Sequence, residues 1–155
     1  MSGKAHISFE ITLTGRVWME ATLIHGEDAI SAEATYLSDA PSDLIHTMRS
    51  LLNGQNEAIC KWQDEPGEYR WLFRREDDRL FVALLWFEDN FSKKRDEDGD
   101  VLFADEDDLH RFAGSLLSAF HALAMNCPPA EYEAQWGYPF PQRALRRLQE
   151  ALHQA

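Results

Sequence analysis

The sequence Leu80-Phe81-Val82-Ala83-Leu84-Leu85-Trp86-Phe87 decides the fold of this chain. All eight side chains are apolar, whereas a strand with one face in water alternates apolar and polar residues. We therefore expect residues 80–87 to form the central strand of a sheet, covered on both faces. Two shorter strand-like runs precede it, residues 57–63 and 68–75. Because turns of only about four residues join the three runs, neighbouring strands should pair antiparallel.

The remaining elements follow from periodicity. Alternation predicts strands over residues 6–14, 17–25 and 29–37, and helical spacing predicts a helix over 42–53. Four acids, Asp105 to Asp108, should open a second helix, since carboxylates suit the positive end of the helix dipole. Residues 89–104 then form the longest irregular segment, 136–141 an extended connector, and 142–154 a last helix. The expected fold is α+β: one domain over residues 1–155, with an antiparallel sheet of about six strands (order βββαβββαα) and helices packed on one face.

Composition places the chain among folded, cytoplasmic proteins. It is 45% hydrophobic, and its longest apolar run, eight residues, is far too short for a membrane span. The N-terminus leads directly into strand-like alternation and shows no signal-peptide pattern. Cys60 and Cys127 lack metal-ligand spacing, so we interpret both as reduced thiols in a cytoplasm.

Negative charge is concentrated in one stretch of the sequence. The chain has a formal net charge of −12, and residues 89–108, with nine acids and three bases, contribute −6 of it. Such a charge disfavours nucleic acid and anionic membranes as partners, and it favours a basic protein. The candidate partner-binding residues are the acids in and after the irregular segment: Asp96, Glu97, Asp98, Asp100, Asp105, Glu106, Asp107 and Asp108. The alternative is that these carboxylates serve solubility alone.

No pattern of catalytic or metal-binding residues stands out. Residues 96–100 resemble the start of a calcium loop, but Val101 stands where that loop requires glycine. The six histidines lack the spacing that puts two ligands on one helix face. No nucleophile motif, phosphate-binding glycine loop or dinucleotide fingerprint occurs. The sequence therefore predicts no metal site, no cofactor and no catalytic residues.

Two aromatic stretches remain as candidate binding residues. Arg70 and Arg74 share one face of a predicted strand, with aromatic residues on the other, and could contact an anion or line a pocket. The alternative is that these arginines, with Arg75 and Arg79, pair with acids close by in sequence. Trp136 lies in the proline-rich connector, where it either plugs one end of the core or lines a groove.

One local motif carries a family resemblance. The segment Glu65-Pro66-Gly67-Glu68-Tyr69-Arg70-Trp71, followed by a charged turn and the apolar strand, resembles small acidic bacterial proteins of uncharacterised or toxin-immunity type. The resemblance implies a protein that binds and blocks a toxin, often through an acidic surface that faces a basic nuclease. It implies no catalytic residues.

The leading hypothesis is therefore a non-enzymatic, immunity-type binding protein with a basic, toxin-like partner. The alternative is a small-molecule-binding or enzymatic domain with an aromatic pocket between sheet and helices. That pocket would be lined by Trp62, Trp86 and Trp136, with an arginine at its mouth. A homodimer through an exposed sheet face or edge is a third possibility.

Overall fold

The computed structural model describes residues 6–154 and confirms an α+β fold with antiparallel strands. The first three strands, β1 (Ile7–Gly15), β2 (Trp18–His25) and β3 (Asp28–Thr35), form one sheet in the order β1-β2-β3. Along β1 the buried Ile7, Phe9 and Ile11 alternate with exposed residues, as the sequence pattern predicts. This sheet therefore has one face on the core and one in water.

The second sheet contains the strand on which the fold prediction was based. It has the order β4-β5-β6-β7, with β4 Glu57–Gln63, β5 Glu68–Glu76, β6 Arg79–Phe87 and β7 Asp100–Asp108. The apolar run is β6, which is an inner strand between β5 and β7, as expected. Within residues 6–154 there are thus seven strands in two sheets, where one sheet of about six was predicted.

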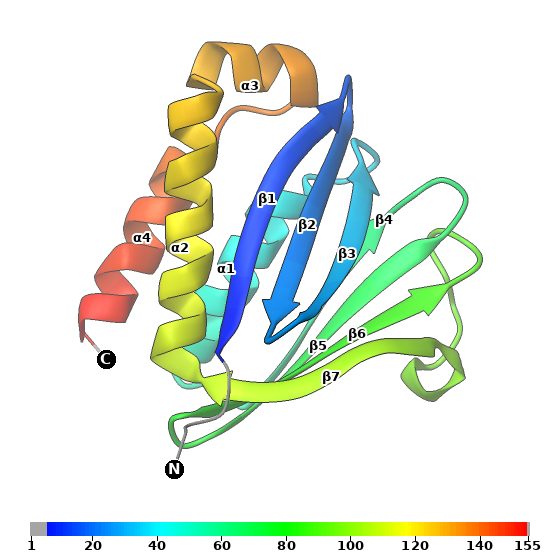
Figure 1. The fold of residues 1–155 in the computed structure, drawn as a ribbon, viewed down its shortest axis with the longest axis vertical. Helices are drawn as coiled ribbons and strands as arrows, with labels where there is room; N and C mark the ends of the chain where they lie inside the picture. The colour runs from blue at the N-terminus through cyan, green and yellow to red at the C-terminus, as the bar shows by residue number, and fades with distance from the viewer. Residues whose placement is uncertain (1–5, 155) are drawn as a thin grey trace.

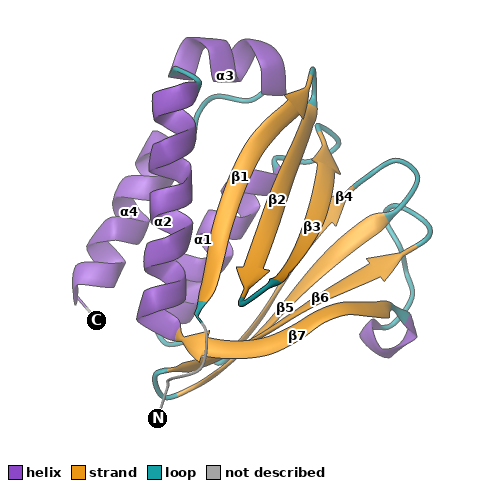
Figure 2. Ribbon diagram, viewed as in Figure 1, coloured by secondary structure: helices purple, strands orange, loops and turns teal. Residues whose placement is uncertain are grey.

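All the α-helices lie on one side of the two sheets, as Figures 1 and 2 show. They are α1 (Ala40–Leu52), α2 (Leu109–Asn126), α3 (Pro129–Trp136) and α4 (Gln142–Gln154). α2 packs along β1, α1 packs along β4, and α4 packs against both α1 and α2. No helix within residues 6–154 is both long and apolar enough to cross a bilayer.

Aromatic side chains join the two sheets and the helices in one core. Phe9 of β1 lies 6.0 Å from Trp71 of β5 and 6.5 Å from Phe112 of α2, measured between ring centroids. Trp62 of β4 contacts Trp71 at 5.3 Å in an edge-to-face arrangement, which is favourable for aromatic pairs. The inward face of β5, with Trp71 and Phe73, is thus the centre of the core.

The prediction that both faces of β6 are covered is wrong for half of the strand. The inward residues Leu80, Val82 and Leu84 are buried, but Phe81 and Ala83 on the outward face are only partly buried. The outward face is covered only toward the end of the strand, at Leu85 and Phe87. A strand that is apolar on both faces need not be covered on both faces by its own chain, because a second molecule can cover an exposed apolar face.

The four acids Asp105 to Asp108 do not open a helix; they end β7. The prediction failed because carboxylates favour a helix start locally, whereas here the ladder with β6 and contacts to the first sheet determine the structure. α2 begins one residue later, with the Asp108 side chain accepting a hydrogen bond from the Arg111 amide at 3.0 Å. The connector around Trp136 was also misassigned, because Trp136 is the last residue of α3.

Candidate protein-binding surface

A buried ion cluster organises the outward face of the second sheet. The Arg70 guanidinium donates to Glu68 Oε2 from Nε at 2.9 Å and from Nη2 at 2.7 Å, and it donates to Asp96 Oδ1 from Nη1 at 2.8 Å. Arg70 is 2% exposed and Glu68 is fully buried. Arg70 also stacks on the Phe87 ring, 3.9 Å from its centroid. Removing one member would leave an unpaired buried charge, so the cluster fixes what lies above it.

Residues 88–99, here called the strap, lie on that cluster. The Ser92 amide donates to Glu68 Oε1 at 3.1 Å, and Arg70 Nη1 donates to the Lys94 carbonyl at 3.1 Å. At the start of the strap, the Asn90 amide donates to the Pro66 carbonyl at 2.7 Å. Further along, Gly99 lies against the Phe87 ring, where an added Cβ would come within 2.6 Å of it. The strap therefore covers one half of the outward face and leaves the other half open.

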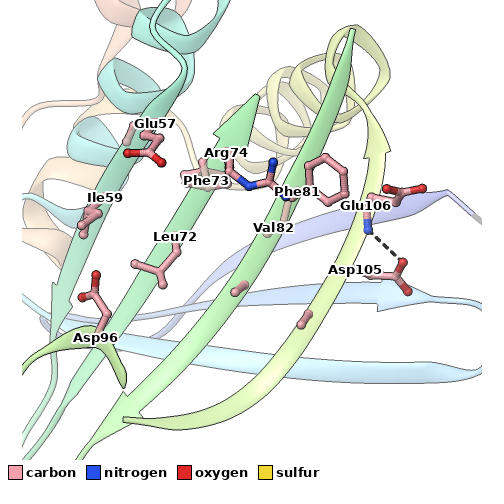
Figure 3. Close-up of a pocket in the computed structure, with 13 residues that line it drawn as sticks. Glu57, Ile59, Leu72, Phe73, Arg74, Phe81, Val82, Asp96, Asp105 and Glu106 are labelled. Carbon is pink, nitrogen blue, oxygen red and sulfur yellow. Dashed lines mark hydrogen bonds between the residues drawn. The ribbon is translucent and has the colours of Figure 1, made fainter. Parts of the chain in front are cut away.

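The open half forms a shallow groove with a volume of about 680 Å³, shown in Figure 3. Its floor comes from neighbouring positions on four strands, since Ile59 pairs with Leu72, Leu72 with Ala83, and Ala83 with Ala104. Phe81 continues the floor beside Ala83 on β6. We call this the outer groove, with the floor Ile59, Leu72, Phe81, Ala83 and Ala104. Ile59 is 51% exposed although it lies on an edge strand, where exposed apolar residues are usually avoided.

Charged side chains surround this apolar floor. The acids Glu57, Asp96 and Glu106 lie at its border, and Arg74 stacks on the Phe81 ring, 4.2 Å from its centroid. Arg74 is paired with Glu76, and Arg79 lies 3.3 Å from Glu106. Glu57 has no ion-pair partner within the described part of the chain. The groove is thus an apolar floor with a predominantly acidic border.

The candidate arginines are engaged within the protein. Arg70 is buried in the ion cluster, and Arg74 pairs with Glu76 next to it on the same face. Arg75 donates from Nε to the Asp77 carbonyl at 2.7 Å and from Nη1 to the Leu51 carbonyl at 2.5 Å. The interpretation that these arginines pair with groups nearby in sequence is therefore confirmed for Arg70 and Arg74. Only Arg74 of the two candidates lines the outer groove.

Two of the candidate acids face the first sheet and hold it. Asp107 Oδ2 accepts a hydrogen bond from the Ile7 amide at 3.0 Å, and its Oδ1 lies 3.1 Å from His6 Nδ1. Asp107 is 2% exposed. Asp105 Oδ2 lies 3.1 Å from His25 Nδ1 at the end of β2. These two carboxylates join β7 to β1 and β2. Asp107 is buried by its contact, whereas the Asp105 side chain remains 34% exposed.

The other candidate acids are accessible to solvent. Glu97, Asp98 and Asp100 are exposed, whereas Asp96, Glu106 and Asp108 are partly buried. Glu97 and Asp98 pair only with Arg95, which is itself 75% exposed, and pairs of this kind are weak. The candidate acids thus divide into a solvent-accessible group on the strap and β7 and a pair, Asp105 and Asp107, whose carboxylates contact the first sheet.

The candidate tryptophan does not line an open site. Trp136 is completely buried, and its indole Nε1 donates to Asp39 Oδ1 at 3.0 Å, so it plugs one end of the core. Trp62 is also completely buried. Arg70 lies on the opposite face of the second sheet from Trp62 and Trp71. The residues of the predicted aromatic pocket are therefore separated by the sheet or by the core.

The thiols and histidines show no reactive arrangement. Cys60 and Cys127 are both free and buried, and burial raises the pKa of the Cys60 thiol to about 12. A thiol with such a pKa remains protonated, and hence a poor nucleophile, at neutral pH. Within residues 6–154 no group of three or more histidine, cysteine or acidic residues is placed to hold a metal ion.

Sequence reasoning missed the floor of the outer groove. Ile59, Leu72 and Ala83 were assigned to strands, but only residues 80–87, which include Ala83, were predicted to be covered on both faces, and the register that brings the three side chains together was not predicted. One signal was available, because Ile59 shares its face of β4 with Glu57 and Lys61. An isoleucine between two charged residues on one strand face indicates an exposed apolar position.

Comparisons with known proteins add little to this picture. No protein-family model matches the sequence, and no curated protein matches it. A chain of the CdiA-CT/CdiI toxin and immunity complex from Enterobacter cloacae is similar in structure, with a TM-score of 0.44 and 14% sequence identity. The superposition covers 77% of this chain and 99% of that chain. A similarity at this level carries no argument about fold or function.

Proposed function

We propose that this protein is a non-enzymatic, immunity-type protein of the cytoplasm that binds and neutralises a basic partner protein. The observation that supports this most is the group of exposed carboxylates on the strap and the outer face. The strap and β7 together hold ten acids and three bases, so they contribute −7 of the formal charge of −12. A negative surface of this kind accelerates association with a positive partner and disfavours nucleic acid. The resemblance of residues 65–71 to immunity-type proteins agrees with this function.

The acids that contact the partner are those that remain exposed in the fold. They are Glu97, Asp98 and Asp100, with Asp96, Glu106 and Asp108 at the edges. Asp105 and Asp107 are excluded, because their carboxylates are used between the two sheets. Among the described residues Glu97 and Asp98 pair only with the exposed Arg95, so a basic protein can pair with these two acids at little cost in lost interactions. Asp96, in contrast, already accepts a hydrogen bond from the buried Arg70.

Binding should therefore depend on salt and on these carboxylates. The protein is immobilised and exposed to host lysate at low and at high salt, and retained proteins are identified and then purified. We expect a basic protein that is retained at low salt and released at high salt. Purified partner should bind the triple variant Glu97→Gln/Asp98→Asn/Asp100→Asn more weakly. The matched control is Glu131→Gln/Glu133→Gln/Glu150→Gln, which removes three exposed acids from α3 and α4.

Two results would contradict the proposal. One is a partner whose affinity does not change with salt concentration. The other is an equal loss of affinity in the two triple variants, since that would reflect net charge and not a defined surface. Neutralisation is tested separately. The gene that encodes the identified partner is co-expressed with the wild-type protein or with each variant, and cell growth is measured.

A further inference from the structure

We infer that the outer groove is the anchoring site of the partner and that it takes an extended protein segment with an apolar side chain between lysines or arginines. This inference rests on the proposed function, because it assigns the place where the basic partner docks. It adds a chemical requirement that charge alone does not impose. The partner must insert an apolar group between the acids that border the groove.

Exposed apolar residues gather on the sheet side of the molecule. Of the seven large hydrophobic residues that are exposed within residues 6–154, four lie on the second sheet or on the strap: Ile59, Phe91, Val101 and Leu102. Of the other three, Met125 lies in α2, and Tyr36 and Leu37 lie in the connection between β3 and α1. An apolar floor with a polar border is the arrangement found at protein docking sites, where the centre excludes water.

The groove has the form of a binding surface and not of a deep ligand pocket. Its floor is a single sheet face, so a small molecule would keep one side in water, whereas enclosed sites bury most of a ligand. Its volume of about 680 Å³ accommodates a few side chains of an extended segment. The strap ends the groove on one side, and it is held there by the ion cluster Glu68, Arg70 and Asp96.

Charge selects a basic partner over a second copy of this chain. Glu57 and Glu106 border the floor, and the strap adds the exposed Glu97 and Asp98. Two copies that met at this face would bring these acids together, with a formal charge of −12 on each chain. The Glu57 carboxylate at the edge of the floor has no ion-pair partner among residues 6–154. A partner segment with lysines or arginines beside its apolar side chain would instead place a positive charge next to this carboxylate.

The test uses two labelled peptides of equal charge with the intact protein. In the first, lysine alternates with leucine; in the second, serine replaces each leucine. Affinity is measured by fluorescence anisotropy, and the site is located by the chemical-shift changes of the Ile59 and Leu72 methyl groups. We expect the leucine peptide to bind about tenfold more tightly than the serine peptide, as burial of a leucine side chain implies. Both methyl groups should shift with the leucine peptide.

Two threonine variants separate the groove from the rest of the sheet. Ile59→Thr replaces an ethyl group of the floor with a hydroxyl and keeps the β-branched shape. Val101→Thr replaces a methyl group with a hydroxyl on β7, outside the groove. Ile59→Thr should weaken the leucine peptide severalfold and leave the serine peptide unchanged, and Val101→Thr should change neither. Because both side chains are at least half exposed, both variants should fold.

The possible outcomes distinguish the inference from the proposed function. If both peptides bind equally well and binding weakens with salt, the acidic surface is supported as a binding site and the role of the outer groove is contradicted. Equal effects of Ile59→Thr and Val101→Thr would also overturn it. If neither peptide binds at low salt, the attraction for a basic partner fails, and both the proposed function and this inference are contradicted.

Discussion

Arg70 shows how a charged residue can be buried outside the hydrophobic core, although its charge suggests a surface role. It lies on the outward face of β5, yet the strap closes over it, and Glu68 and Asp96 complete its hydrogen bonds. Arg74, two residues further along the same face, stays open to water and pairs with Glu76. The two arginines therefore differ in energetic role, although the sequence gives them the same surroundings.

This difference predicts unequal effects of the same substitution. Arg70→Met leaves Glu68 buried without its partner, and we expect a loss of about 3–5 kcal/mol in the free energy of unfolding. Arg74→Met should cost about 0–1 kcal/mol, because an exposed pair contributes little. Urea denaturation followed by circular dichroism measures both values. Equal stability of the two variants would show that the ion cluster does not hold the strap.

The Cys60 thiol offers a second test at the residue scale. Burial raises its pKa to about 12, so the thiol stays protonated at pH 8 and the reactive thiolate is scarce. Cys60 should therefore react with iodoacetamide at pH 8 only in denaturant. Cys127, which is also buried and has a raised pKa, is tracked separately by peptide mass spectrometry. Rapid labelling of Cys60 in the native protein would contradict its placement in the core.

At the scale of elements, the sequence predicts individual helices and strands better than it predicts contacts between residues that are far apart in the chain. The inner position of β6 was predictable because eight apolar residues in a row do not suit an edge strand. The last helix, residues 142–154, was predicted with its bounds. The strand character of Asp105 to Asp108 was not predictable, because their contacts are with residues far away in the chain. Asp107 contacts His6 and Ile7, about a hundred positions away, and Asp105 contacts His25 of β2.

α3 was missed although local signals for it exist. Proline is favoured in the first turn of a helix, and Pro129 occupies that position. Gly137 follows in the left-handed conformation, with φ of 104°, which is typical of a helix C-cap. Of the candidate site, the exposed acids of the strap could be predicted from sequence. The outer groove could not, because its floor combines four strands whose register is not visible in the sequence.

Two glycines, Gly67 in the turn before β5 and Gly114 in α2, should respond oppositely to substitution by alanine. A Cβ on Gly67 would collide with the Trp86 ring and with the Phe87 carbonyl, so Gly67→Ala should destabilise the protein by about 1–3 kcal/mol. A Cβ on Gly114 in α2 meets nothing within 4 Å, and Gly114→Ala should stabilise by up to about 1 kcal/mol. Thermal unfolding measures both. A stabilising Gly67→Ala would contradict the close approach of β5 and β6 at this turn.

At the scale of the whole molecule, the two sheets are held together by the core and by carboxylates of β7. Asp107 accepts a hydrogen bond from the Ile7 amide, and the Asp105 carboxylate lies beside the His25 ring. Two of the candidate acids therefore perform a structural role. This division matters for function, because substitution of Glu97, Asp98 or Asp100 should change stability less than substitution of Asp107, whose carboxylate accepts the Ile7 amide hydrogen bond. The proposed partner surface is therefore confined to the acids that remain exposed on the strap and β7.

Asp107→Ala tests this structural role. The substitution leaves the buried Ile7 amide without an acceptor, and we expect a loss of about 1–3 kcal/mol in the free energy of unfolding. Asp100→Ala removes an exposed carboxylate from the same strand and should change stability by less than about 0.5 kcal/mol. Urea denaturation compares them, and similar stability of the two variants would contradict the link between β1 and β7.

Hydrogen exchange of the protein with and without its purified basic partner tests the central claim most directly. We predict that binding slows exchange of amide protons in the strap and in β4 to β7, around Ile59, Leu72 and Ala83. Exchange in α3 and α4 should stay unchanged, since neither helix contributes to the acidic face. Protection confined to the helices, with the strap and the outer groove exchanging as in the free protein, would contradict the account.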